Sequence, residues 1–100
     1  MTIINKIVNW GKERGILDNS NSLTQLAKLT EEHGEVAKAI LLGDKEGLEK
    51  EIGDAGVVLT LLAKLNGFDF EQCMIKAHNK NNSRKTKMIN GTAVKESDLK

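Results

Sequence analysis

The chain has 100 residues, of which 39% are hydrophobic and 3% aromatic, so it can form one domain around a core of aliphatic side chains. Its single cysteine excludes an internal disulfide. The sequence contains neither an apolar run of the roughly 18 residues that span a membrane nor the pattern of a signal peptide. We therefore expect a single-domain cytoplasmic protein.

The net charge of +1 conceals an uneven distribution. Residues 1–75 carry 8 basic and 12 acidic side chains, a net charge of −4, whereas residues 76–100 carry 7 and 2, a net charge of +5. A basic end of this kind suits contact with nucleic acid or with the phosphates of a small ligand, and it equally suits a solvated lysine-rich surface.

Four helices are expected, because Gly, Asn, Asp and Ser interrupt otherwise periodic apolar segments. A capping box from Ser22 to Gln25 opens the second helix, and the sequence also offers caps for the first and fourth. The expected ranges are 3–14, 22–42, 44–66 and 69–81. After these helices, the pair Asn90-Gly91 between two short apolar stretches predicts a small β-hairpin.

These elements predict an all-α fold. We expect a four-helix bundle-like protomer built on a central antiparallel helix hairpin, because only a short turn around Gly43 connects the second and third helices. Residues 1–84 would form the helical domain, and residues 85–100 would form a basic C-terminal tail.

Carboxylates recur at helical spacing on the two middle helices. Glu32 and Glu35 lie three residues apart on the second helix. On the third helix, Glu51 and Asp54 repeat this spacing. Residues at equal distance from the turn of a helix hairpin face each other, which pairs Glu35 with Glu51. The same rule pairs Glu32 with Asp54, so we expect the four carboxylates to converge on one small volume. The apolar face of the second helix is expected to be core, and its members are Leu23, Leu26, Leu29, Val36 and Ile40.

Unpaired anions in a packing seam are costly, and Lys28 is the only basic side chain that we expect to offset them. Carboxylate oxygens without cysteine favour Mg²⁺, or alternatively Mn²⁺, over zinc. A di-iron carboxylate bundle is disfavoured, because neither His33 nor His78 follows a glutamate by three residues. We therefore expect the four carboxylates to bind a divalent cation.

The four acids also carry a resemblance. Glu32-x-x-Glu35, then fifteen residues, then Glu51-x-x-Asp54 resembles the ExxE…ExxD signature of the all-α nucleotide pyrophosphohydrolases, the MazG-like superfamily. The stretches QLAKLTEEHGE and EIGD, and the segment 79–84 with its lysine-rich continuation, resemble small phage and bacterial members. The resemblance covers about residues 5–85.

The resemblance implies Mg²⁺-dependent hydrolysis of a nucleoside triphosphate, a deoxynucleoside triphosphate in particular, to the monophosphate and pyrophosphate. It assigns catalysis to the ExxE pair, and we expect Glu32 to accept the proton of the attacking water, with Glu35 as the next candidate. Some members carry an aromatic residue four positions after the final aspartate to contact the base, whereas this chain has Val58 there.

Substrate-binding side chains are expected on three helices. Gln25 and Lys28 share the acidic stripe of the second helix, and Trp10 on the first is either a core residue or a platform for a base. On the fourth helix, one face carries basic and amide groups that can hold the pyrophosphate end: Lys76, Asn79, Lys80 and Arg84.

Two other classes of protein stay open. The chain can be a helical nucleic-acid-binding protein that uses its basic end, or an interaction module without catalysis. The apolar stripes on two sides of the third helix also exceed what a four-helix chain can cover, so we expect a homodimer or a homotetramer, as the resemblance also suggests.

Overall fold

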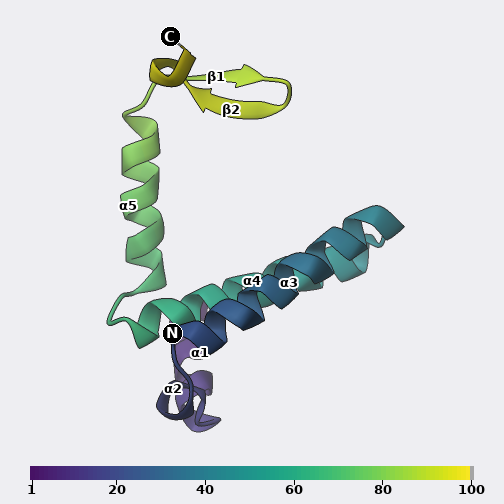
Figure 1. The fold of residues 1–100 in the computed structure, drawn as a ribbon. Coiled ribbons are helices and arrows are strands. Elements are labelled where there is room, and N and C mark those ends of the chain that lie inside the picture. The colour runs from purple at the N-terminus through teal and green to yellow at the C-terminus, as the bar shows by residue number, and fades with distance from the viewer. Residues whose placement is uncertain (100) are drawn as a thin grey trace.

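The computed structural model describes residues 1–99, which form helices and one β-hairpin (Figure 1). In chain order the elements are α1 (Ile3–Glu13), α2 (Ile16–Asn19), α3 (Ser22–Leu42), α4 (Lys45–Leu65), α5 (Phe70–Asn82), β1 (Thr86–Ile89), β2 (Thr92–Lys95) and the 3₁₀ helix η1 (Glu96–Leu99). The predicted all-α class is confirmed. Within the described range, no helix combines the length and apolar character that a membrane crossing requires. Lys100, the last residue of the expected tail, lies outside the described residues.

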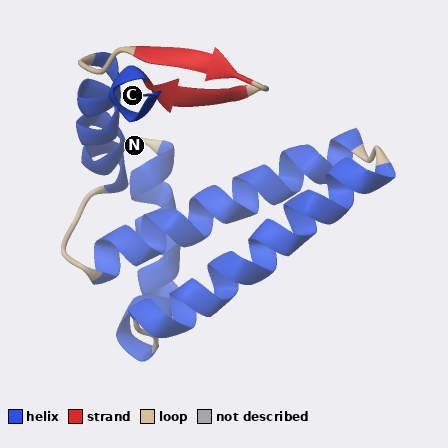
Figure 2. Ribbon diagram, turned by 45° about the horizontal axis from the view of Figure 1, so that its top comes forward, coloured by secondary structure: helices blue, strands red, loops and turns tan. Residues whose placement is uncertain are grey.

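The long helices α3 and α4 lie side by side as the predicted antiparallel hairpin (Figure 2). Gly43 ends α3 in the left-handed conformation, with φ 67°, and Asp44 caps α4 by accepting a hydrogen bond of 2.9 Å from the Gly47 backbone N–H. At the other end of the hairpin, the Asn66 side chain donates a hydrogen bond of 2.9 Å to Ser22 Oγ. The short turn and this bond fix the register between the two helices.

The cap of α3 differs from the prediction, whereas the caps predicted for α1 and α5 are present. Asn21, rather than Ser22, is the N-cap: its Oδ1 accepts a hydrogen bond of 2.9 Å from the backbone N–H of Thr24. Thr24 Oγ1 accepts one of 3.0 Å from the Asn21 N–H in return. Asparagine is as good an N-cap as serine, so the local preference did not decide between them. Because the N-cap lies one residue earlier than predicted, Thr24 rather than Gln25 completes the capping box.

Helices α1 and α2 pack at one end of the hairpin (Figure 1). Gly11 is buried against α4, and a Cβ at this position would lie 2.6 Å from Leu61 Cδ2, so any larger residue would force the Leu61 side chain or α1 to shift. Gly15, with φ 74°, then ends α1 and leads into α2. The sequence did not predict α2, because a four-residue helix is too short to show a periodic pattern.

The hydrophobic core of a single chain is small. Its buried apolar side chains are Ala39, Val58, Leu61 and Ala63. On α3 the residues buried against α4 belong to the polar stripe and are Gln25, Glu32 and Ala39. The expectation that the opposite face of α3 is core holds only in part within one chain, because Leu29 and Val36 are half-buried and the other members are exposed. The exposed members of that face are Leu23, Leu26 and Ile40.

Helix α5 extends away from the hairpin and carries the β-hairpin at its far end (Figures 1 and 2). The predicted turn is present: Asn90 and Gly91 have φ 50° and 80°, and Ile89 pairs with Thr92. Gly67, with φ 77°, ends α4 and redirects the chain into α5. The radius of gyration of 16.2 Å exceeds the roughly 13 Å of a compact chain of this length. One chain alone therefore does not close its helices into a bundle.

Candidate active site

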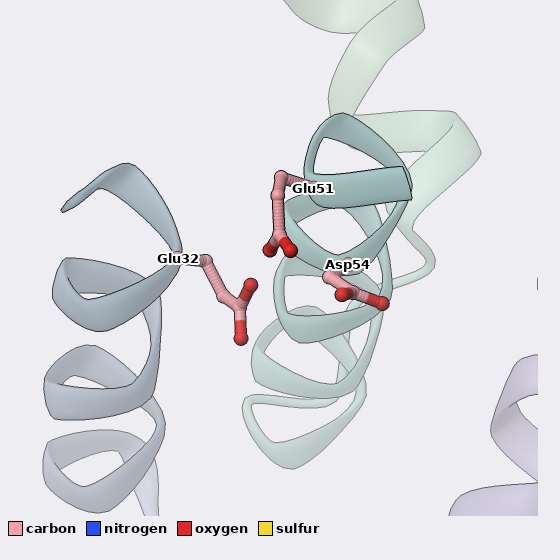
Figure 3. Close-up of side chains that lie close together, drawn as sticks. All are labelled: Glu32, Glu51 and Asp54. Atoms are coloured by element: carbon pink, nitrogen blue, oxygen red, sulfur yellow. The ribbon is translucent and has the colours of Figure 1, made fainter. Parts of the chain in front are cut away.

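Three carboxylates meet between α3 and α4 (Figure 3). Glu32 on α3 reaches toward Glu51 and Asp54 on α4, and one carboxylate oxygen from each of the three lies within 4.8 Å of the other two. Residues one turn apart share a helix face, which explains why both α4 acids are available to a single residue of α3. The structure thus brings together three of the four acids that the sequence singled out.

Glu32 is the buried member of this group. Its side chain is 10% exposed, and Oε2 is buried with no hydrogen-bond partner within residues 1–99. The other oxygen, Oε1, lies 3.6 Å from Lys28 Nζ, which is beyond hydrogen-bonding distance. Buried carboxylate oxygens normally accept at least one hydrogen bond or bind a cation. Oε2 is therefore available to a ligand that the chain itself does not supply.

Burial is the main reason that the pKa of the Glu32 carboxyl lies above its ordinary value of 4.5. Glu51 is close enough to share a proton with Glu32, and the negative charge of Asp54 also favours the protonated form. The positive charge of Lys28 opposes these effects but does not cancel them. Glu32 consequently holds a proton more readily than an exposed glutamate does.

A second basic residue at the acidic cluster was missed in the sequence. Lys50 Nζ lies 3.1 Å from Asp54 Oδ2 and 3.4 Å from Glu51 Oε1. These two hydrogen bonds raise the pKa of the Lys50 ammonium above its ordinary value. The signal in the sequence was the spacing of four residues between Lys50 and Asp54, which places both on one helix face.

Glu35 does not belong to the cluster. It lies one turn beyond Glu32 on α3, and its side chain is exposed. The expectation of four converging carboxylates is therefore wrong by one residue in this structure. The pairing rule places Glu35 opposite Glu51, but Glu51 contacts Glu32 and Lys50 instead.

An open cleft of about 700 Å³ adjoins the cluster. It contains three predicted substrate-binding residues, Trp10, Gln25 and Lys28, as well as Glu32 and Asp54. Trp10 is 40% exposed, so it is not a core residue of the single chain. Lining residues that the sequence did not single out come mainly from the segment between α1 and α3, and they are Arg14, Gly15, Ile16, Asn19 and Ser20; Thr24 at the start of α3 also lines the cleft. Val58 contributes to the apolar wall.

A short hydrogen-bond chain orients Gln25 in this cleft. Ser20 Oγ donates a hydrogen bond of 2.6 Å to the Ile16 carbonyl, so this oxygen can only accept from another partner. Gln25 Nε2 donates to Ser20 Oγ at 3.3 Å. The orientation of the buried amide is thereby fixed.

The predicted phosphate-binding residues of α5 lie elsewhere in the single chain. Of the described residues, those that line the cleft all precede residue 62. Lys76 and Asn79 line a separate surface pocket at the start of α5, and Arg84 lies beside the β-hairpin. Lys80 is exposed on the same helix. Within one chain, α5 does not bring these residues to the acids, because the chain turns away from the hairpin at Gly67.

Fold and site together define an all-α protein in which a helix hairpin presents a cluster of carboxylates suited to a divalent cation beside an open cleft. The chain belongs to the MazG nucleotide pyrophosphohydrolase domain family, whose sequence model matches residues 20–89. This match covers α3, α4 and α5, and so includes every residue of the acidic cluster.

One curated relative is a protein of Haemophilus phage HP1 (strain HP1c1), described as an uncharacterized 18.2 kDa protein in the rep-hol intergenic region. It is 33% identical over 67 residues, which are 67% of this chain and 41% of the phage protein. The chain thus spans less than half the length of that relative. No solved structure matches the chain.

Proposed function

We propose that this protein hydrolyses nucleoside triphosphates, deoxynucleoside triphosphates in particular, to the monophosphate and pyrophosphate, with Mg²⁺ or Mn²⁺ as cofactor. The observation that carries the proposal is the buried, unpartnered Oε2 of Glu32, which lies beside two further carboxylates at the edge of a cleft. Membership of the nucleotide pyrophosphohydrolase family supports the reaction class.

The donor set fits a hard divalent cation. Three carboxylates offer oxygen ligands only, which are the ligands that Mg²⁺ prefers, and one oxygen from each lies within 4.8 Å of the other two. Glu32, Glu51 and Asp54 would hold the ion. When bound, the cation supplies positive charge to the phosphate oxygens and makes the attacking water more acidic.

Glu32 is the proposed general base. The water oxygen forms a bond to the α-phosphorus while the bond from that phosphorus to the bridging oxygen breaks, and the electron pair leaves with pyrophosphate. The proton of the water passes to Glu32 Oε2, which has no hydrogen-bond partner among residues 1–99. The raised pKa of Glu32 brings its basicity closer to what a general base needs near neutral pH.

The cleft has the right length for the rest of the nucleotide. Gln25 precedes Glu32 by seven residues, which is about 10.5 Å along an α-helix. A triphosphate at the acidic cluster therefore places its base near Gln25 and Trp10. Trp10 would stack on the base, and the oriented amide of Gln25 would hydrogen-bond to it. Lys28, between these two regions on α3, would offset phosphate charge.

The product test distinguishes this reaction from other phosphatase activities. With Mg²⁺ and a panel of nucleoside and deoxynucleoside triphosphates, we expect monophosphate and pyrophosphate, so a phosphate assay should respond only after inorganic pyrophosphatase is added. Direct release of orthophosphate with a diphosphate product would contradict the mechanism. Salt-sensitive nucleic-acid binding without any turnover would favour the alternative class instead.

A homo-oligomer, dimer or tetramer, is the proposed active form. The support is the exposed apolar face of α3, which a single chain leaves uncovered, and the opposite charges of the acidic body and the basic α5 region. In such an assembly, α5 of a second copy would bring its basic residues to the acidic cluster of the first. We expect light scattering at micromolar concentration to give a dimer or a larger assembly. An active monomer would contradict the proposal.

Mixing two inactive variants tests the exchange of α5. Asp54→Asn removes an acid, and the double variant Lys80→Ala, Arg84→Ala removes basic groups of α5. If a second copy supplies α5, each mixed dimer in a refolded equimolar mixture has one intact site of two. About half of the dimers are mixed, so the mixture should regain about a quarter of the parent activity. Persistent inactivity of the mixture would show that each chain uses its own α5.

A further inference from the structure

The position of Lys50 bears on the same site, so this inference rests on the proposed function. Its ammonium lies within 3.1 Å of one carboxylate of the cluster and 3.4 Å of another. The side chain remains 71% exposed, and its ion pairs within residues 1–99 are those with these two acids. Lys50 precedes the Glu51-x-x-Asp54 pair and belongs to none of the patterns that defined the site.

Positive charge is distributed unevenly around the three acids. Lys28 contacts Glu32 from α3 at 3.6 Å and also lies 3.7 Å from Glu31, which is outside the cluster. Lys50, in contrast, contacts the two acids of α4 at shorter distance and has no ion pair elsewhere among the described residues. The ammonium of Lys50 thus offsets the charge of two of the three carboxylates that would bind a divalent cation.

We infer that Lys50 is a tethered counter-ion, which holds Glu51 and Asp54 together before the metal binds and which the metal then displaces toward the phosphates of the substrate. The ammonium and the metal ion compete for the same two carboxylates, and two cations cannot occupy that volume together without strong repulsion. The exposed four-carbon stem allows the ammonium to move without disturbing the fold. Lys50 is therefore a positioning residue that opposes metal binding and favours triphosphate binding.

The first measurement is the affinity for Mn²⁺ in the absence of nucleotide, by isothermal titration. Lys50→Met keeps the length of the stem and removes the charge. We expect it to bind Mn²⁺ roughly tenfold more tightly than the parent at low ionic strength, which corresponds to repulsion between a unit charge and a divalent ion about 6 Å apart in water. Lys50→Arg, which keeps the charge, should bind as the parent does.

The second measurement is the affinity for a triphosphate whose α–β bridge is an imido group and cannot be hydrolysed, at saturating Mg²⁺. Here the effect should reverse, because Lys50→Met loses an ammonium that contacts the phosphates. We expect binding to weaken by roughly three- to fivefold. Lys45→Met, an exposed substitution on the first turn of α4, serves as the matched control and should change neither affinity.

The proposal predicts opposite changes in the two affinities of Lys50→Met, which should bind Mn²⁺ more tightly and the triphosphate more weakly than the parent. Unchanged or weaker Mn²⁺ binding by Lys50→Met would overturn it, and so would unchanged triphosphate binding. Failure of the unmodified protein to bind Mn²⁺ at all would overturn the proposed function as well. Because both readouts are equilibrium affinities, a variant that merely loses turnover cannot imitate the expected result.

Discussion

At the scale of single residues, Glu32 is the most unusual feature of the chain. A carboxylate that is buried without a complete set of partners destabilises a fold, and it is retained where a ligand or a reaction uses it. Lys28 and Lys50 each offset part of the charge of the cluster, but both are more than half exposed. The residual cost of the ionised Glu32 is measurable in the metal-free protein.

Glu32→Gln should raise the melting temperature of the EDTA-treated protein at neutral pH. The folded-state pKa of Glu32 is raised by burial, by Glu51 and by Asp54, so the protonated form is favoured in the fold. That stability is fully present below about pH 4.5, the unfolded value, and is lost as pH rises through the raised pKa. The difference between variant and parent should therefore close on acidification.

Thermal unfolding over a pH series, followed by circular dichroism, checks this expectation. Each kcal/mol shifts the melting temperature of a domain this size by roughly 4–8 °C, so a small effect is detectable. Glu31→Gln, at the exposed neighbouring position, should show little pH-dependent difference. If Glu32→Gln instead melts below the parent at neutral pH, the carboxylate stabilises the fold through Lys28 and is a structural ion-pair partner.

At the scale of elements, the hairpin of α3 and α4 holds the acids and α1 forms the opposite wall of the cleft. The position of α1 depends on a close contact between its backbone at Gly11 and the side chain of Leu61, which is 3% exposed. Because Leu61 also lines the cleft, the same contact sets the shape of the site. Packing of α1 and geometry of the cleft are therefore coupled.

Gly11→Ala should destabilise the protein by about 1–2 kcal/mol. Overpacking of a core contact costs about 1–3 kcal/mol, and the gain in helix propensity returns at most about 1 kcal/mol. Gly34→Ala on α3, where a Cβ meets no atom within 4 Å, should instead be neutral or stabilise by up to about 1 kcal/mol. Denaturant unfolding of both variants measures the contrast, and equal effects would show that α1 does not pack tightly on α4.

At the scale of the whole molecule, the chain consists of an acidic body and a basic region that extends from it. The small core and the long α5 indicate that the folded protomer leaves apolar surface for an assembly, which is the reason for the proposed oligomer. The stability of the whole molecule should also depend on the cation, because the acids belong to the helix hairpin on which the other helices pack.

Mg²⁺ should stabilise the fold by mass action, by about 2.7 kcal/mol at a hundredfold excess over its dissociation constant. This corresponds to a rise of roughly 10–20 °C in melting temperature for a domain of this size. Asp54→Asn should reduce the rise and abolish turnover, whereas Glu49→Gln, at an exposed position of α4 outside the cluster, should do neither. A parent protein whose melting temperature does not respond to Mg²⁺ would contradict the metal site.

The sequence by itself determined the four long helices, the caps of α1 and α5, the hairpin turn at Gly43 and the β-turn at Asn90-Gly91, because these depend on neighbours within a few residues. It also placed Glu32, Glu51 and Asp54 on facing stripes, since the helical period assigns each residue to a face. Gln25 and Lys28 were selected in the same way, whereas Trp10 was selected as the large aromatic side chain of its helix, and the cleft contains all three.

Tertiary structure alone decided which of these residues meet. Glu35 shares the stripe of Glu32 but is exposed to solvent. The helical period determines on which face of the helix a residue lies, but it does not determine whether the side chain contacts a residue of the facing helix. The course of α5 depends on a few backbone angles around Gly67, and a small change there moves the far end of a 13-residue helix by many ångströms. Burial of Glu32 likewise results from the contact between two helices, and burial is what leaves Oε2 free for a ligand.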